Sequence, residues 1–142
     1  MTPVALFILL YVFSFLPIFR WTACDLYLTI ERRMIELRYY RTAAGANVVE
    51  DWLDSLRDER AAARIAARLT RLAAGNFGDC KPLEQGIWEL RIDYGPGYRV
   101  YYAKVGRACV LLLCGGDKRQ QSADIQRAVE YWDDYRQRTR NP

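Results

Sequence analysis

The sequence contains no histidine, and only 3 of its 21 basic residues are lysine. Histidine is the commonest general base at neutral pH and a frequent zinc ligand, so both roles would fall to other residue types. Any catalysis must therefore use arginine, lysine, tyrosine or carboxylate groups, and we expect neither a metal ion nor another cofactor. Because the positive charge is almost all arginine, it is suited to planar, two-pronged contacts with phosphate or carboxylate.

Cysteine is scarce as well, and no C-x-x-C spacing is present, which argues against the zinc and redox motifs built on it. Two of the cysteines are five residues apart on one expected strand, an odd separation that would place them on opposite faces of a sheet. We expect buried, reduced thiols in a cytosolic protein. The four residues are Cys24, Cys80, Cys109 and Cys114.

The chain has 142 residues, of which 51% are hydrophobic and 27% are charged. That length and composition are sufficient for one domain with its own core. The formal net charge of +4 is compatible with a nucleic-acid partner and equally with an ordinary basic surface. Charge alone does not choose between these two interpretations.

The first 33 residues differ from the rest, because Val4–Phe19 is an uncharged apolar run. The run is short for a transmembrane helix, which needs roughly 20 apolar residues. Our preferred interpretation is a mis-called start, with translation beginning at Met34. The alternative is a membrane anchor formed by residues 4–19, with Arg20 and later arginines on its cytoplasmic side. We therefore divide the chain into an apolar extension, 1–33, and a domain, 34–142.

Alternation and helical periodicity predict seven elements in the order β-α-α-β-β-β-α. This order indicates an α+β fold in which an antiparallel-rich sheet carries a helical hairpin and a C-terminal helix, all packed on one face. Thr42 or Asn47 can cap the first helix, and Asp58 the second. The expected elements are a strand over Ile35–Tyr40, helices over Val48–Leu56 and Asp58–Gly75, strands over Ile87–Tyr94, Tyr98–Val105 and Cys109–Cys114, and a helix over Ser122–Arg138.

Strand parity places polar side chains of the second and third strands on one side of the sheet. If Tyr94 pairs with Tyr98 across the Gly-Pro-Gly turn, Asp93 faces Arg99 and Arg91 faces Tyr101. Such a set is often only the solvated face of an antiparallel sheet. The members of this open side are Glu89, Arg91, Asp93, Arg99 and Tyr101.

Two further groups of basic residues adjoin this face. Lys118 and Arg119 directly follow the buried strand and Gly115-Gly116, at a strand end where turns often present side chains to ligands. The second helix carries arginines in one continuous stripe, which is either a solubilising surface or a footprint for a nucleic-acid backbone. The stripe consists of Arg57, Arg60, Arg64, Arg68 and Arg71.

Several motifs of residues 34–138 together resemble the RelE/ParE toxin superfamily, and most closely its HigB-like addiction module killer branch. They are Trp88-Glu89-Leu90-Arg91, the segment from Gly95 to Tyr102, Leu111 to Lys118, Asp124-Ile125 and Tyr131-Trp132. The resemblance implies a RelE-like fold and the toxin of a type II toxin–antitoxin pair acting in the cytoplasm. It also implies a cognate, DNA-binding antitoxin, with operator DNA reached only through the complex of the two proteins.

In the nuclease members of that superfamily, mRNA is cut on the ribosome. Carried over to this sequence, the resemblance implies that Arg91, Arg99 and Lys118 act on the phosphate. Two positions depart from the pattern: Glu89 replaces a second basic residue, and no tyrosine follows soon after Lys118.

A metal-independent mechanism can be assembled from these residues. Attack of the ribose 2′-hydroxyl on the adjacent phosphate needs a base, a stabiliser of the phosphorane and an acid. Arg91 and Arg99 would clamp the phosphate, and Lys118 would assist the leaving oxygen. For the base we hypothesise Glu89, on the same face as Arg91. Residues expected to contact the substrate are Tyr101, Arg119, Arg64, Arg68 and Arg71.

Two other functions share the same fold. One is a ParE-like toxin that inhibits gyrase without cutting RNA, and the other is a non-catalytic protein that binds an antitoxin or nucleic acid. Fold alone does not separate them.

Overall fold

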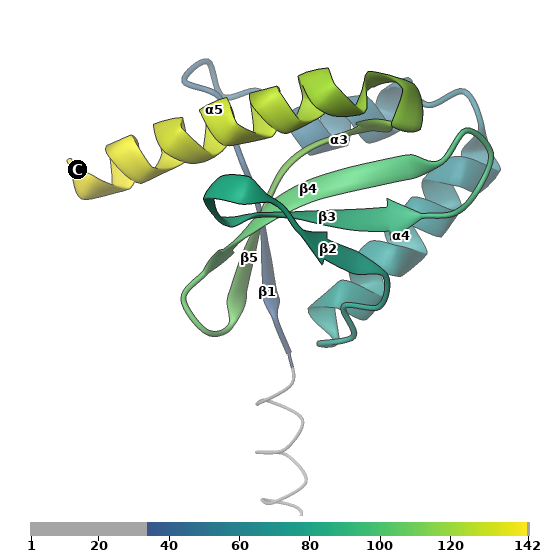
Figure 1. Cartoon of the computed structure of the whole chain (residues 1–142), viewed down its shortest axis with the longest axis horizontal. Helices are drawn as coiled ribbons and strands as arrows, with labels where there is room; N and C mark the ends of the chain where they lie inside the picture. The colour runs from purple at the N-terminus through teal and green to yellow at the C-terminus, as the bar shows by residue number, and fades with distance from the viewer. Residues whose placement is uncertain (1–33, 142) are drawn as a thin grey trace, which may run out of the picture. The chain divides into compact units, whose positions relative to one another are not determined.

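The computed structural model describes residues 34–141, which form an α+β fold with a five-stranded mixed sheet and three α-helices (Figure 1). The strands lie in the order β1-β5-β4-β3-β2 across the sheet. Along the chain the elements are β1 (Glu36–Tyr39), α3 (Val48–Ser55), α4 (Glu59–Ala73), β2 (Cys80–Pro82), β3 (Ile87–Ile92), β4 (Tyr98–Val105), β5 (Cys109–Asp117) and α5 (Gln121–Arg140).

The sheet is mostly antiparallel, as the sequence predicts. β2, β3, β4 and β5 form three antiparallel pairings in succession, and β1 runs parallel to β5. The expected order lacks β2, because this strand has only 3 residues and ends in Pro82. Such a segment shows no alternation, and its strand conformation depends on pairing with β3.

Capping side chains set the starts of the helical hairpin. Asn47 caps α3 by accepting from the backbone N–H of Glu50, so Asn47 rather than Thr42 fills this role. Asp58 caps α4 by accepting from the N–H groups of Arg60 and Ala61. Both helices therefore begin where the sequence predicts.

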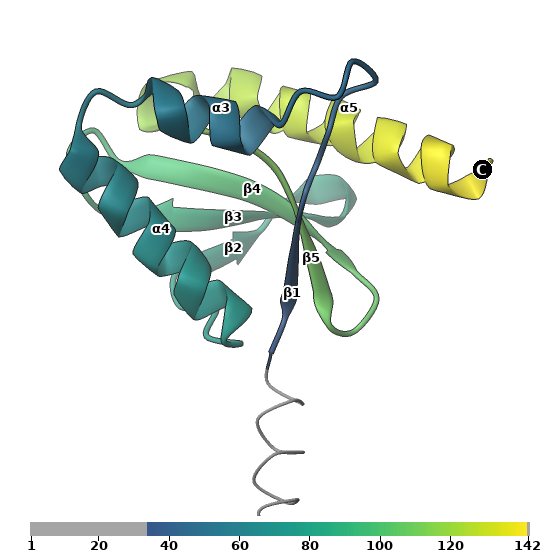
Figure 2. The ribbon, with the colours of Figure 1, turned by 180° about the vertical axis from the view of Figure 1, so that it is seen from behind.

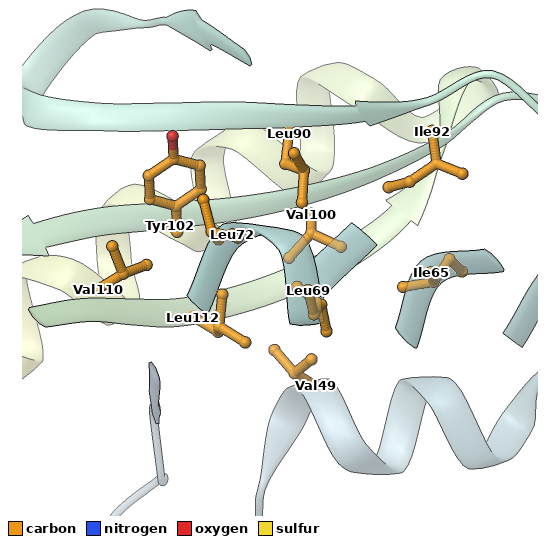
Figure 3. Packing of buried hydrophobic residues seen from close by; sticks show 10 residues of the cluster. All are labelled: Val49, Ile65, Leu69, Leu72, Leu90, Ile92, Val100, Tyr102, Val110 and Leu112. Atoms are coloured by element: carbon orange, nitrogen blue, oxygen red, sulfur yellow. The ribbon is translucent and has the colours of Figure 1, made fainter. Parts of the chain in front are cut away.

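The three helices cover both faces of the sheet, and the expectation that all pack on one face is wrong. α3 and α4 lie on one face, while α5 crosses the opposite face, as the two opposed views show (Figure 2). The reason is that β5 is apolar on both faces, so each face needs a cover. Figure 3 shows the core under α3 and α4, where Val49, Ile65 and Leu69 meet Val100 and Leu112.

The second core lies beneath α5. Ala128 of this helix packs with Tyr101, Leu111 and Leu113, all buried. Toward its C-terminal half α5 is fastened to the end of β1, where the Tyr40 hydroxyl donates to Asp134 across 2.7 Å. Burial first, and then this hydrogen bond, raise the pKa of Tyr40 to about 12.

The hairpin of β3 and β4 pairs two residues away from the expected register. Ile92 pairs with Tyr98, and Arg91 pairs with Arg99, so Arg91 does not face Tyr101. A shift of two residues keeps every side chain on its face, which is why the division into an apolar and a polar set is confirmed. A bulge between Tyr101 and Tyr102 then disturbs β5 and places Cys114 on the α5 side, so simple parity fails there.

Glycines in β5 allow the helices to approach the sheet closely. The strand does not end at Cys114 but continues through Gly115 and Gly116 to Asp117. A Cβ at Gly115 would overlap the ring of Trp52 from α3, and a Cβ at Gly116 would overlap the carboxylate of Asp124 from α5. Gly115 therefore faces α3 and Gly116 faces α5 on the opposite side of the sheet, and neither position has room for a side chain.

Within residues 34–141, no helix is long and apolar enough to cross a membrane. The expected membrane anchor at residues 4–19 lies outside the described residues. The expectation that translation starts at Met34 also concerns that segment, residues 1–33. Cys80, Cys109 and Cys114 are free thiols, as expected, but only Cys114 of these three is buried, whereas Cys80 and Cys109 are partly exposed. Cys24 lies outside the described residues.

Substitution of Gly115 by alanine should destabilise the domain by about 2–3 kcal/mol, because the new methyl group overlaps a packed aromatic ring. Gly45→Ala is the control. Gly45 has a positive φ of 85° but open space around it, so only backbone strain of about 1 kcal/mol is expected. Urea unfolding of both variants measures the difference. A loss at Gly115 no larger than that at Gly45 would contradict the close packing of α3 on β5.

Candidate anion-binding site

A buried carboxylate organises the polar end of the sheet. Glu89 is 0% exposed, although it comes from the side that the sequence predicts to be open, because α5 covers it. Its Oε1 accepts from Nε of Arg91 at 2.9 Å and from a terminal nitrogen of Arg99 at 2.6 Å. Its Oε2 accepts from the amide of Gln121 at 2.8 Å. Glu89 therefore links both arginines to Gln121, the first residue of α5.

Strand pairing explains why this carboxylate is needed. Arg91 and Arg99 are direct partners across β3 and β4, where like charges repel. Glu89 bridges the two guanidinium groups and offsets that repulsion. Its hydrogen bond, above all, raises the pKa of Arg91, and Asp79 adds a smaller effect from 3.6 Å.

The two arginines differ in exposure. The side chain of Arg91 is 37% exposed, whereas that of Arg99 is only 14% exposed. The Nε–H of Arg99 is buried and has no hydrogen-bond acceptor among residues 34–141. A guanidinium group held by a buried carboxylate keeps its exposed terminal nitrogens in a fixed direction, which suits a bound oxyanion.

Arg91, Arg99 and Lys118 line one pocket of about 200 Å³ at the end of the hairpin. Lys118 follows β5 directly, and its backbone N–H donates to the carbonyl of Gly97 at 2.8 Å, which fixes the turn beside the pocket. The structure thus brings together the three basic residues that the sequence nominates for phosphate chemistry. The pocket also contains Asp79 and Asp93 at its rim.

The two other nominated residues near this end lie elsewhere. Tyr101 is completely buried under α5, and its hydroxyl has no partner among the described residues. Burial, followed by the charges of Glu89 and Asp124, raises the pKa of Tyr101. Arg119 is exposed, pairs with Asp117 at 2.8 Å and lines a separate shallow hollow with Lys118.

Three arginines of the stripe, all on α4, line a second and larger hollow of about 430 Å³. Arg64, Arg68 and Arg71 form one wall, and the β3 end from Arg91 to Asp93 forms the other. Arg57 and Arg60 are exposed and lie outside it. We call this hollow the α4 groove.

Two residues of the site are absent from the sequence-based prediction. Gln121 ties α5 to Glu89, and no sequence signal marks it, because the contact joins residues 32 positions apart. Asp79 borders both hollows and pairs with Arg91. Asp79 lies just before β2, a strand of 3 residues that the sequence does not predict, so no sequence signal marks Asp79 as part of the site.

An α+β domain with a mostly antiparallel sheet, and with basic residues gathered at the sheet end, fits the RelE-like fold in general. The model of the family described as "Phage derived protein Gp49-like (DUF891)" matches residues 51–130, which is more than half of the chain. The chain therefore belongs to the Gp49-like family. This is a RelE/HigB-like, toxin-type family associated with toxins of toxin–antitoxin systems.

A relative from Haemophilus influenzae (strain ATCC 51907 / DSM 11121 / KW20 / Rd) carries the name "Uncharacterized protein". It is 53% identical over 79 residues, which cover 56% of this chain and 80% of the relative. The name of this relative adds no activity.

Glu89→Ala should destabilise the fold by about 2–4 kcal/mol, because it leaves two neighbouring guanidinium groups without their shared acceptor. Glu89→Gln keeps one acceptor oxygen and should cost less. Glu36→Ala is the matched control, since Glu36 pairs with Arg38 at the same spacing on β1 but both are at least half exposed. Thermal and urea unfolding should show no measurable change for the control. Equal losses for Glu89→Ala and Glu36→Ala would argue against the buried bridge.

Proposed function

We propose that this chain is the toxin of a type II toxin–antitoxin pair, of the HigB-like addiction module killer kind. In this proposal it inhibits translation by cutting mRNA on the ribosome without a metal ion. The observation that carries the proposal is the shared pocket of Arg91, Arg99 and Lys118. Membership of a toxin-type family supports the same assignment.

The proposed chemistry is transfer of a phosphodiester to its own 2′-hydroxyl. The 2′-hydroxyl releases its proton to solvent water as its oxygen forms a bond to phosphorus, and the bond to the 5′-oxygen of the next nucleotide breaks, giving a cyclic phosphate and, after protonation of that oxygen, a free 5′-hydroxyl. Arg99 and Arg91 hold the phosphate oxygens and stabilise the charge that develops on them. Lys118 lies beside them and would donate a proton to the departing 5′-oxygen.

The role of Glu89 in this mechanism follows from its contacts. As general base it would have to reach the 2′-hydroxyl, but it is fully buried and already accepts three hydrogen bonds. These contacts favour a positioning role, in which Glu89 aims both guanidinium groups into the pocket. Gln121 would extend that role by fixing the second carboxylate oxygen.

The proposed partners are the ribosome with its mRNA, and a cognate antitoxin that binds DNA. Operator DNA would be contacted only through the complex with the antitoxin, and the site of action would be the cytoplasm. An antitoxin that covers the pocket at the sheet end would block Arg99 and Lys118 together.

Arg99→Ala and Lys118→Ala should each abolish growth arrest and mRNA cleavage, with cleavage reduced by at least about a hundredfold. Controlled expression of the full chain in a bacterial host, followed by mapping of mRNA 5′ ends, measures this effect. Arg107→Ala is the control, because Arg107 is exposed in the turn between β4 and β5, outside the pocket. Purified Lys118→Ala and Arg107→Ala should retain the unfolding midpoint of the wild type, whereas Arg99→Ala should lower it, because the buried Glu89 loses its nearest partner. Lys118→Ala therefore tests the pocket without a change in stability.

Glu89→Gln separates the two roles of Glu89. A general base would be lost entirely, whereas a positioning group should leave reduced but measurable cleavage at the same mRNA sites. No cleavage by the wild-type protein, together with inhibition of gyrase in a supercoiling assay, would contradict the nuclease and favour the ParE-like alternative.

A further inference from the structure

The arginines of the α4 groove are not neutralised by acidic partners. Among residues 34–141, none of Arg64, Arg68 and Arg71 forms an ion pair. The groove contains four arginines, including Arg91, against the two carboxylates of Asp79 and Asp93. Its net positive charge is therefore available to an anion from outside the domain.

Two of these guanidinium groups are held in place rather than left free in solvent. Arg68 donates to the carbonyl of Phe77 at 3.1 Å, and its terminal nitrogens lie 2.7 and 2.8 Å from where a Cβ of Gly78 would be. Gly78 has a φ of +56°, so both its backbone conformation and its missing side chain suit this contact. The guanidinium carbon of Arg64 lies 4.6 Å from the ring centroid of Tyr94.

Holding an arginine in this way lowers the entropy lost when it binds a ligand. A stripe that served only solubility would need no backbone carbonyl, glycine or aromatic ring to fix it. Arg64, Arg68 and Arg71 also follow one another along α4 at steps of roughly 4–6 Å, from a rise of 1.5 Å per residue. The groove thus presents three arginines in a row, two of them held in place, and suits a ligand with repeated negative charge.

The α4 groove continues into the pocket of Arg99 and Lys118. Both hollows are bordered by the same four residues, which belong to the start of β2 and the end of β3. A chain lying in the groove would therefore reach the pocket without crossing another element. The shared border consists of Asp79, Arg91, Ile92 and Asp93.

The walls also indicate which kind of chain would fit. Among residues 34–141, Ala67 and Ile92 are the only aliphatic side chains that line the groove, and Ile92 is 5% exposed. An amphipathic helix of a protein partner binds chiefly through large apolar side chains, and none of the described residues that line the groove exposes a large apolar side chain to meet them. A single-stranded nucleic acid needs no such anchor, because its phosphates supply the contact.

We infer that the α4 groove is a second phosphate-binding site, in which Arg64, Arg68 and Arg71 hold the backbone of the same RNA strand whose scissile phosphate lies at Arg99 and Lys118. The identity of the strand rests on the proposed nuclease function. The groove fixes the direction in which the strand leaves the pocket, along α4 and over the Arg91–Asp93 edge.

The test is binding of a fluorescent, single-stranded 2′-O-methyl oligoribonucleotide of about 12 nucleotides to the full chain. This probe lacks the attacking hydroxyl, so binding is measured without cleavage. Arg64→Gln/Arg71→Gln removes two groove cations and leaves Arg68 with its structural contacts. Arg60→Gln/Arg107→Gln removes the same charge from exposed positions outside the groove.

The groove variant should bind at least about tenfold more weakly at about 50 mM salt, and its plot of log affinity against log salt should flatten by about 1.4, or 0.7 for each lost contact. The control pair should bind within about twofold of the wild type with little change in slope. Equal losses in the two pairs, or no binding of the probe by the wild type, would overturn the inference. So would a groove variant that keeps its RNA affinity but no longer binds the antitoxin.

The experiments distinguish rejection of the groove inference from rejection of the proposed nuclease function. If Arg99→Ala leaves mRNA cleavage intact while the groove variant loses RNA, the proposed catalytic pocket is wrong and the second phosphate site stands. If Arg99→Ala abolishes cleavage while the groove variant binds and cleaves as the wild type does, the nuclease stands and the groove inference is wrong.

Discussion

The Glu89 carboxylate joins the fold of this domain to its candidate site. Strand pairing places Arg91 and Arg99 opposite each other, an arrangement that would be unfavourable without an anion between them. Glu89 supplies that anion from inside the protein, and Gln121 fixes its other oxygen. The directions of the two guanidinium groups therefore depend on where α5 begins, and the pocket depends on the packing of a helix that contributes no cation to it.

α5 can occupy this position because the sheet offers it an apolar face and a close approach. β5 is buried on both sides, so a helix is needed on each, and Gly116 leaves room for the carboxylate of Asp124. In the C-terminal half of the helix, the Tyr40 hydroxyl donates to Asp134. Held in both halves, α5 covers Glu89 and Tyr101, so most of this polar sheet face is buried. Only one end of the face stays accessible to solvent. At that end Arg91 is partly exposed and Lys118 is exposed.

Local patterns predicted what depends on local physics. Asn47 and Asp58 mark the starts of α3 and α4 in the sequence, because capping involves neighbouring residues. Strand parity also assigned Glu89, Arg91 and Arg99 correctly to one face. The register was wrong by two residues, because the turn closes with Gly97 donating to Tyr94 and leaves that tyrosine outside the ladder. The position of α5 and its bond from Gln121 to Glu89 depend on contacts between distant parts of the chain. No periodicity encodes such contacts, so the open polar face expected from parity is in fact covered.

The composition of the two hollows bears on which class of ligand they can hold. Most of the described side chains that line them are polar or charged, and Ile92, which borders both, is almost fully buried and cannot serve as an apolar anchor. A protein ligand would have to bring several carboxylates and lose their hydration, a cost that paired charges offset only with good geometry. A polyanion releases counterions when its phosphates meet arginine, and this gain does not require apolar contact. Held guanidinium groups also fork onto phosphate oxygens better than an ammonium group does. The scarcity of lysine and the lack of an exposed large apolar side chain among the described residues of these hollows both favour a phosphate backbone as the ligand of this surface.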